Sequence, residues 1–350
     1  MLGAGGDFPT WPTPRLDLTR AQVLAFRRDA GGLDVRRARG PEALRRAAWA
    51  GLQDSMPRAA LLSIHARVAG TEPGTWEDPS LVQLWGPRYS VFVVAARDVA
   101  VFTLGTLPDD AKGRRRAHDV ASRLHAVLGG TRMAYGQAGR ALGVPPNRLR
   151  YAAATGTVRI RWDGARQPVI WTVPPPETDP HAARLELTRR YLHIYGPATA
   201  ESFGQWAGIG RQAGAAAFEA LGDALTPAAA PGGQGWILTR DEAAFRAAPG
   251  PVAPVRLLPS GDAYFLLQGA DRDLLVPDPG HRQALWTPRV WPGCLLVGGE
   301  VTGTWRRAHA VITITPWRPL SPAEQDAVQA EAQSLPLPGA GGQITVRWAG

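Results

Sequence analysis

The residues best placed to do chemistry are three adjacent polar side chains, Gln53, Asp54 and Ser55, directly before an amphipathic run. Apolar residues recur near helical spacing in this run, which predicts a helix over 56–68. Ser55 would cap this helix, and Pro57 would occupy its first turn. The unpaired backbone N–H groups at such an end can hold a water molecule or an anion. The alternative is that Ser55 simply caps a helix of the core.

Signatures of better-known catalytic sites do not occur: there is no HExxH, no GxSxG, no GxxxxGKS/T phosphate loop and no GxGxxG after a strand. The seven histidines lack the spacing of metal ligands, and Cys294, the only cysteine, excludes a cysteine-based metal centre. We therefore expect neither a metal nor a cofactor. The only lysine, Lys112, lies in a charged run typical of a solvated surface, which argues against a lysine Schiff base.

The overall charge points to a polyanionic partner. The 350 residues carry a net charge of +9, and every basic residue except Lys112 is an arginine or a histidine. Nucleic acid is the first candidate for such a partner and an anionic membrane surface the second. No apolar run approaches the length of a membrane span, and the N-terminus lacks the pattern of a secretory signal. We expect no membrane association and a cytoplasmic, nucleoid-associated protein.

The elements that must position the polar cluster form an α+β chain, since 40 glycines and 32 prolines argue against one helical bundle. In residues 15–107, helices after Thr19, after Pro41 and over 56–68 precede two β-rich runs, 89–95 and 99–104. Residues 96–98 between these runs predict a hairpin turn. Three helices followed by a hairpin is the layout of a winged helix.

The same layout recurs twice, in residues 108–176 and 177–250. In the second unit we expect helices over 109–128 and 131–142, a third from 145, and a hairpin of strands 157–162 and 168–173. In the third unit we expect helices over 180–195, 198–207 and 212–221 and a strand around Trp236. The last part, residues 251–350, contains short strand-like runs and one helix, 322–335, which predicts a small β-barrel. Its runs 301–307 and 310–316 predict a hairpin.

Three such units in a basic chain favour duplex DNA as the partner. Arginines in the predicted hairpins would supply contacts to phosphate. The alternative for any one of these arginines is a solvated surface. Our candidate DNA contacts are Arg58, Arg115, Arg148, Arg150, Trp305, Arg306 and Arg307.

Several phrases then add a resemblance: Gly-Leu-Gln-Asp-Ser at 51–55, Tyr-Gly-Pro-Ala-Thr at 195–199, Asp-Ala-Tyr at 262–264, the stretch 271–282, and Gly-Thr-Trp-Arg at 303–306. With these phrases and its order of units, the chain from Leu18 onward resembles the winged-helix DNA glycosylases of the AlkZ/YcaQ type. The resemblance implies three winged helices and a β-barrel arranged as a C around DNA. It also implies hydrolysis of the N-glycosidic bond of alkylated purines, and some members unhook interstrand cross-links.

The family signature before the third helix is Gln-x-Gln or Gln-x-Asp, whose paired side chains hold the attacking water. Gln53 matches its first position, whereas the middle residue here is Asp54 and the third is Ser55. If the backbone is extended there, Asp54 should point away from its two neighbours. The resemblance thus makes Gln53, Asp54 and Ser55 the candidate catalytic residues.

The expected activity is that of a monomeric, monofunctional glycosylase, because the sequence offers no plausible lysine nucleophile. An alkylated purine already carries positive charge, so it leaves without a strong general acid. The main alternative is a duplex- or damage-binding protein without chemistry. A transcription regulator is a further alternative, but it would require a dimer on a palindromic site.

Overall fold

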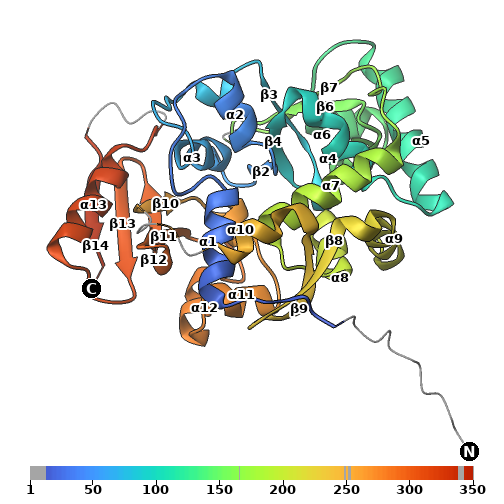
Figure 1. Ribbon diagram of the computed structural model, residues 1–350. Helices are drawn as coiled ribbons and strands as arrows, with labels where there is room; N and C mark the ends of the chain where they lie inside the picture. The colour runs from blue at the N-terminus through green and yellow to red at the C-terminus, as the bar shows by residue number, and fades with distance from the viewer. Residues whose placement is uncertain (1–12, 165, 248–249, 251–253, 338–342, 350) are drawn as a thin grey trace, which may run out of the picture.

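The computed structural model describes residues 13–164, 166–247, 250, 254–337 and 343–349. These residues form four β-sheets, three with three strands and one with five, and helices lie beside each sheet (Figure 1). This is the expected mixture of helices and strands. Within this part of the chain, no helix combines the length and hydropathy needed to cross a bilayer.

The first sheet, in the order β2-β4-β3, carries the polar cluster at the end of β2. As predicted, Thr19 caps the first helix through a hydrogen bond to the backbone of Gln22. The elements of this part are α1 (Arg20–Ala30), α2 (Pro41–Ala47), β2 (Leu52–Gln53), α3 (Ala59–His65), β3 (Leu81–Trp85), β4 (Val91–Ala95) and α4 (Val99–Thr103).

The predicted hairpin of 89–95 and 99–104 is wrong in its second strand. β4 pairs instead with β3, with Leu81 opposite Ala95, and residues 99–103 form α4. Val99 and Phe102 are both buried, which is the spacing of a helix face and not of a strand. The strand preference of valine and threonine is overridden here by packing of the helix against the core.

The second sheet, in the order β5-β7-β6, has the predicted hairpin, with Val158 opposite Thr172. The third predicted helix of this part is a 3-10 helix over Pro146–Thr155. The other elements are α5 (Ala111–Leu128), β5 (Met133–Ala134), α6 (Tyr135–Ala141), β6 (Val158–Arg161) and β7 (Val169–Thr172).

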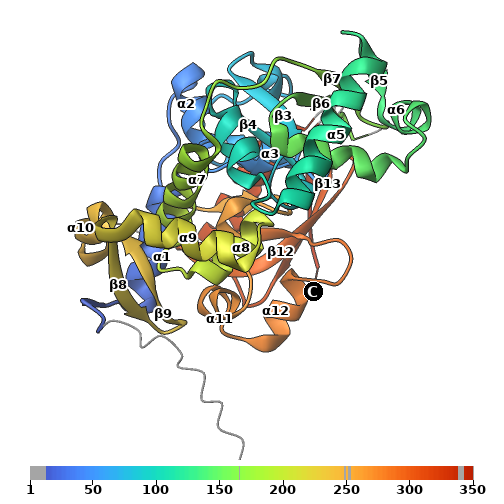
Figure 2. The ribbon, with the colours of Figure 1, turned by 90° about the vertical axis from the view of Figure 1, so that its right-hand side faces the viewer.

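The third sheet includes a strand from the start of the chain, because β1 (Leu16–Asp17) pairs in parallel with β8. Helix α1 packs against α7 and α10. Both β1 and α1 are therefore attached to the third part of the chain, and not to the first sheet (Figure 2). Helix α7 also contacts α4 and thereby joins the third part of the chain to the first. The elements are α7 (Pro180–Tyr195), α8 (Ala200–Ala207), α9 (Arg211–Leu221), β8 (Leu225–Ala230), β9 (Gly233–Leu238) and α10 (Glu242–Arg246).

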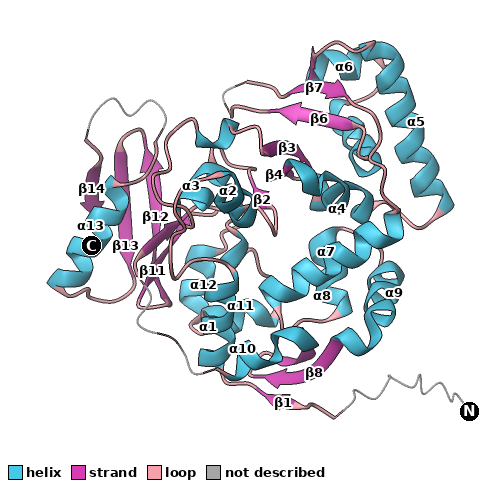
Figure 3. Cartoon of the chain, turned by 45° about the horizontal axis from the view of Figure 1, so that its top comes forward, coloured by secondary structure: helices cyan, strands magenta, loops and turns pink. Residues whose placement is uncertain are grey.

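The last part is an open sheet and not the predicted barrel. Its five strands run in the order β10-β11-β12-β13-β14, and in the described residues the outer strands β10 and β14 do not pair with each other. Helix α13 packs against β10 and β14, so a buried core forms without closure. Figure 3 shows α13 beside β14. The elements are β10 (Arg256–Leu258), α11 (Ala270–Leu275), α12 (Pro279–Leu285), β11 (Gly293–Val297), β12 (Glu300–Ala308), β13 (Val311–Pro316), α13 (Pro322–Gln333) and β14 (Thr345–Trp348).

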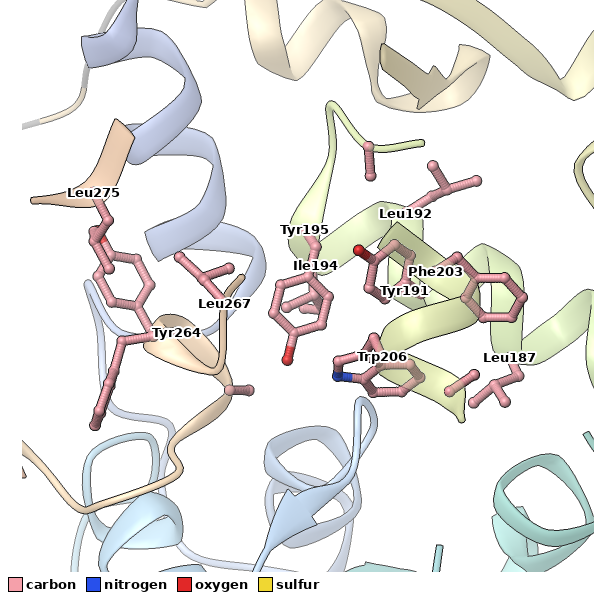
Figure 4. Close-up of a cluster of buried hydrophobic side chains, with 14 of the residues drawn as sticks. Leu187, Tyr191, Leu192, Ile194, Tyr195, Phe203, Trp206, Tyr264, Leu267 and Leu275 are labelled. Atoms are coloured by element: carbon pink, nitrogen blue, oxygen red, sulfur yellow. The ribbon is translucent and has the colours of Figure 1, made fainter. Parts of the chain in front are cut away.

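One continuous hydrophobic core joins the first, third and last parts. It contains Phe92 and Phe102 from the first, Tyr191 and Trp206 from the third, and Tyr264 from the last. Figure 4 shows Tyr191, Tyr195 and Trp206 of this core side by side. Burial of such large side chains, each worth roughly 1.5–3 kcal/mol, fixes these parts against one another and therefore fixes the surfaces between them.

Candidate active site

The polar cluster lies where β2 ends. Gln53 is opposite Phe92 of β4, and the backbone N–H of Asp54 donates to the carbonyl oxygen of Val91 at 2.7 Å. Side chains alternate along such extended backbone. Gln53 and Ser55 accordingly face the same side, and the Nε2 of Gln53 donates to the Oγ of Ser55 at 3.0 Å.

Asp54 points the opposite way, into the core, and is only 1% exposed. Its Oδ1 accepts from the backbone N–H of Ala60 at 3.0 Å, and its Oδ2 accepts from the Nε2 of Gln83 at 2.8 Å. Burial raises the pKa of Asp54 from its usual 3.8 to about 6, while the hydrogen bonds from Ala60 and Gln83 oppose that rise. The carboxylate therefore organises the backbone and does not face a substrate.

The predicted role of Ser55 as helix cap is wrong. The helix begins at Ala59, because Arg58 adopts a left-handed conformation with φ 67° that a helix cannot include. Its N-terminal backbone is satisfied by Asp54 through Ala60. Since the Ser55 hydroxyl is not used as a cap, it is left beside Gln53.

The second part of the chain supports this loop from outside. The Oε1 of Gln83 accepts from the backbone N–H of Trp162 at 2.6 Å, and Arg58 donates to the carbonyl oxygen of Trp162 at 3.3 Å. Gly164, with φ +84°, lies so close to Pro57 that an added Cβ would come within 2.4 Å of the proline ring. The loop after β6 thus packs against residues 54–58 and holds them in place.

Gln53 and Ser55 open onto a pocket of about 380 Å³, which we call the catalytic pocket. None of the described residues that line it is an aspartate, a glutamate or a lysine, and Lys112 lies exposed on α5. The lining comes from four segments, within 53–56, 88–90, 260–272 and 289–291: Gln53, Ser55, Met56, Arg88, Ser90, Ser260, Gly261, Leu266, Leu267, Gln268, Arg272, Arg289, Val290 and Trp291.

Three arginines give the catalytic pocket its positive charge. Arg88 donates to the carbonyl oxygen of Trp206, Arg272 lies 5.4 Å from the ring of Trp291, and Arg289 is exposed at the surface. Burial lowers the pKa of Arg88 and of Arg272 below the usual arginine value. Sequence reasoning missed all three, because no spacing or motif links residue 88 to residues 272 and 289.

Two of the predicted DNA contacts are free at the surface. Arg115 and Arg148 are exposed and have no hydrogen-bond or ion-pair partner within the described chain. Arg306 and Arg307 are also exposed, although Arg306 donates to the carbonyl oxygen of Val290 and Arg307 to that of His309. Arg115 and Arg148 therefore remain available for a partner, whereas Arg306 and Arg307 are exposed but make contacts within the protein.

The other three predicted contacts are engaged within the protein. Trp305 is 4% exposed and donates through its Nε1 to the carbonyl oxygen of Leu258, so its proposed contact with DNA is wrong. The reason is strand alternation: Arg306 faces outward and Trp305 faces the core. Arg58 lies 3.8 Å from the ring of Trp76, and Arg150 donates to the hydroxyl of Tyr135 at 3.1 Å.

The described residues contain no group of three or more histidine, cysteine, aspartate or glutamate side chains that could hold a metal ion. The site consists of an amide, hydroxyls and guanidinium groups. Such groups can orient water and bind anions, while proton transfer by a carboxyl group would have to come from elsewhere.

Comparisons with known proteins agree with the resemblance seen in the sequence. Residues 45–336 match the family model described as DNA glycosylase AlkZ-like. An interstrand DNA cross-link repair glycosylase of Streptomyces sahachiroi is 31% identical over 158 residues, which are 44% of this chain and 42% of that protein. The match therefore spans less than half of that relative's length.

A solved structure shares the fold. Streptomyces sahachiroi DNA glycosylase AlkZ superimposes with a TM-score of 0.75 over 95% of this chain and 100% of that one, at 19% sequence identity. At this identity the likeness concerns the fold alone.

Proposed function

This chain belongs to the AlkZ-like DNA glycosylase family, and from that premise we propose that it releases alkylated purines, including bulky or cross-linked ones, from duplex DNA. The catalytic pocket would receive the damaged base after it leaves the base stack. A pocket of about 380 Å³ is within the usual range for a small organic ligand.

The observation that carries the proposal is an unpaired acceptor at the pocket. The Oε1 of Gln53 is buried and has no hydrogen-bond partner in the described residues, while its Nε2 is held by Ser55. An unpaired buried acceptor costs about 1–3 kcal/mol, so the amide needs a donor that is small enough to reach it. Water fits this requirement, and Gln53 with Ser55 would orient it toward the sugar.

Because the described pocket lining has no carboxyl group, the released base must be one that leaves without being protonated by the enzyme. A purine alkylated at N7 or N3 is cationic and departs as a neutral base, so no acid has to protonate it. Asp54 cannot serve, because both of its oxygens are bound inside the protein. We assign Asp54 the role of a positioning residue for Gln53 and Ser55.

We further propose that the enzyme is monofunctional and leaves an intact abasic site. A β-lyase of the Schiff-base type needs an amine at the sugar, and no lysine is found among the described lining residues. Lys112 lies on α5, at the surface of the second part.

The three units, over 15–107, 108–176 and 177–250, are proposed to be winged helices, with 251–350 as a separate domain. Each pairs helices with a three-stranded sheet, although β1 and α1 are attached to the third. The chain would act as a monomer that curves around duplex DNA at the nucleoid. Arg115, Arg148, Arg306, Arg307 and Arg289 are the arginines we propose for its phosphate contacts.

Base release from duplex DNA with a single N7-methylguanine tests the proposal. We expect wild-type protein to release the base, and Gln53→Ala to slow single-turnover release about 100-fold or more. Ser55→Ala, which frees the amide to rotate, should slow it about tenfold. Lys112→Ala is the matched control and should release at the wild-type rate without nicking the strand.

Three outcomes would contradict the proposal. Equal rates for wild type and Gln53→Ala would remove Gln53 from the chemistry. Strand nicking that disappears in Lys112→Ala would mean a lyase. Salt-sensitive duplex binding by wild type, with no release from any alkylated purine, would favour a damage-binding protein instead.

A further inference from the structure

A second pocket of about 310 Å³ adjoins the catalytic pocket; we call it the aromatic pocket. Leu266, Leu267 and Gln268 line both pockets, so this short segment forms the wall between them. Arg88 lines the catalytic pocket and donates to the carbonyl oxygen of Trp206, and Trp206 lines the aromatic pocket. The two spaces are therefore neighbours that share a thin partition.

Three aromatic rings from the third part line the aromatic pocket. Tyr191 lies 4.9 Å from Tyr195 and 5.2 Å from Trp206, measured between ring centroids. In Figure 4, Tyr195 lies between Leu267 of the partition and Trp206. Gln205 and Gln234, both exposed, add amide groups at the rim. Aromatic walls with a few amides suit a planar ring that carries polar atoms.

An unpaired charged donor also lies at this pocket. Arg27 is 3% exposed, and its Nε and Nη2 donate to the carbonyl oxygens of Gly196 and Tyr195 and to Asp271. Its Nη1 is buried and has no hydrogen-bond partner among the described residues. Because an unpaired buried guanidinium N–H is costly, the site favours a ligand with a hydrogen-bond acceptor.

We propose that the aromatic pocket binds a planar, acceptor-bearing ring carried by the lesion, while the damaged purine itself occupies the catalytic pocket. This rests on the proposed function and deepens it by giving the substituent a site of its own. Contact with the pocket lining, where Tyr195 and Trp206 are only 2% and 5% exposed and Gln205 and Gln234 offer amides at the rim, together with a hydrogen bond from Arg27, would favour bulky aromatic adducts over a methyl group.

The test fills the aromatic pocket and leaves the catalytic pocket open. Gln205→Trp and Gln234→Trp place a large ring at the rim from two different elements, α8 and β9. Gln212→Trp on α9 is the matched control, because Gln212 is exposed and lines neither pocket. Release is measured from two duplexes, one with N7-methylguanine and one with an N7-guanine adduct that carries a polycyclic aromatic group.

We expect the ratio of the two rates, bulky over methyl, to fall about 10- to 100-fold in both filled variants, the range for loss of one stacked ring. The control should keep the wild-type ratio. An unchanged ratio in both filled variants would overturn the proposal, as would wild-type protein that releases methylguanine and not the bulky adduct.

A binding measurement keeps the two proposals separate. Duplexes with the same lesions on a 2′-fluoro sugar resist cleavage, so their dissociation constants can be compared without chemistry. We expect wild type to bind the bulky duplex more tightly and the filled variants to lose that preference. Suppose that no lesion is released, but wild type binds the bulky duplex more tightly and the filled variants do not. The glycosylase proposal then fails, and the proposed role of the aromatic pocket is supported. Equal affinity of wild type for both duplexes overturns the pocket.

Discussion

Replacing Gln83 with leucine should slow base release, although Gln83 does not line the catalytic pocket. The side chain is 4% exposed and makes three hydrogen bonds. Its Nε2 donates to Asp54 at 2.8 Å and to the carbonyl oxygen of Trp162 at 3.3 Å, and its Oε1 accepts from the backbone N–H of Trp162 at 2.6 Å. Gln83 therefore connects the loop after β6 to the residue between Gln53 and Ser55.

The magnitude follows from the groups that lose a partner. Leucine has a similar size but leaves one oxygen of Asp54 and the N–H of Trp162 unpaired in a buried place. Each such group costs about 1–3 kcal/mol, so the free energy of unfolding should fall by about 2–6 kcal/mol. A displaced Asp54 would shift Gln53 and Ser55 with it. We expect single-turnover release to slow about tenfold to 100-fold, as for a small misplacement of a positioned group.

The pH–rate profile separates positioning from a general loss of stability. Gln83 lowers the pKa of Asp54, which burial holds at about 6. Without Gln83 that pKa rises, so the pH below which activity is lost should move upward. Protonated Asp54 loses the charge that strengthens its hydrogen bond from the N–H of Ala60, in wild type and in the variant alike, which is why activity should fall on the acid side.

A swapped pair provides the control. Asp54→Asn alone places two amide donors against each other, and Gln83→Glu alone places two carboxyl groups together. The double variant restores one donor and one acceptor at this contact, so it should recover much of the stability and rate lost in each single variant. Wild-type release by folded Gln83→Leu, with an unchanged pH profile, would refute the reasoning.

Three further predictions concern stability and binding. The folded state raises the pKa of Asp54 from 3.8 to about 6, so the folded protein binds this proton more tightly than the unfolded chain does. The contribution of Asp54 to the free energy of unfolding is therefore greatest below about pH 4 and falls by about 3 kcal/mol as the pH rises past 6. Melting temperatures against pH should show this fall in wild type and not in Asp54→Asn. Trp305→Ala should lower the free energy of unfolding by about 3–5 kcal/mol, and chemical denaturation will measure it, while duplex affinity of the folded variant at low temperature stays the same. Arg148→Ala and Arg289→Ala should each reduce the slope of log Kd against log salt by about one; an unchanged slope for either would remove that arginine from the DNA surface.

Elements whose ends carry their own signals could be predicted from the sequence. Helix α7 has the predicted bounds, Pro180–Tyr195, and α8 lies within the predicted 198–207, where Thr199 caps it. The hairpin of β6 and β7 follows from alternating residues on either side of Asp163-Gly164. In each case the information is local, so neighbouring residues in the sequence suffice.

The rest depends on contacts between distant residues. Val99 to Thr103 have the preferences of a strand, and only the core against Phe102 makes them a helix. Closure of a sheet requires its first and last strands to meet, which no local pattern reports. The inward direction of Trp305 depends on the register of its strand, since a shift by one residue would turn the same side chain outward. Likewise the arginines of the catalytic pocket come together only through the fold.

The departure of Ser55 from the family pattern narrows the chemistry that the proposed site can perform. A carboxylate at that position could accept a proton from water, but a hydroxyl is a poor base, and the nearby Asp54 is turned away into the core. An amide and a hydroxyl can orient water and do little more. The reaction must then be driven by the leaving group, which makes a fixed positive charge on the purine a requirement and not merely a preference. A neutral damaged base, which has to be protonated as it leaves, would find no carboxyl group among the described lining residues, and we therefore propose that the lesions open to such an enzyme are those whose alkylation has already supplied the charge.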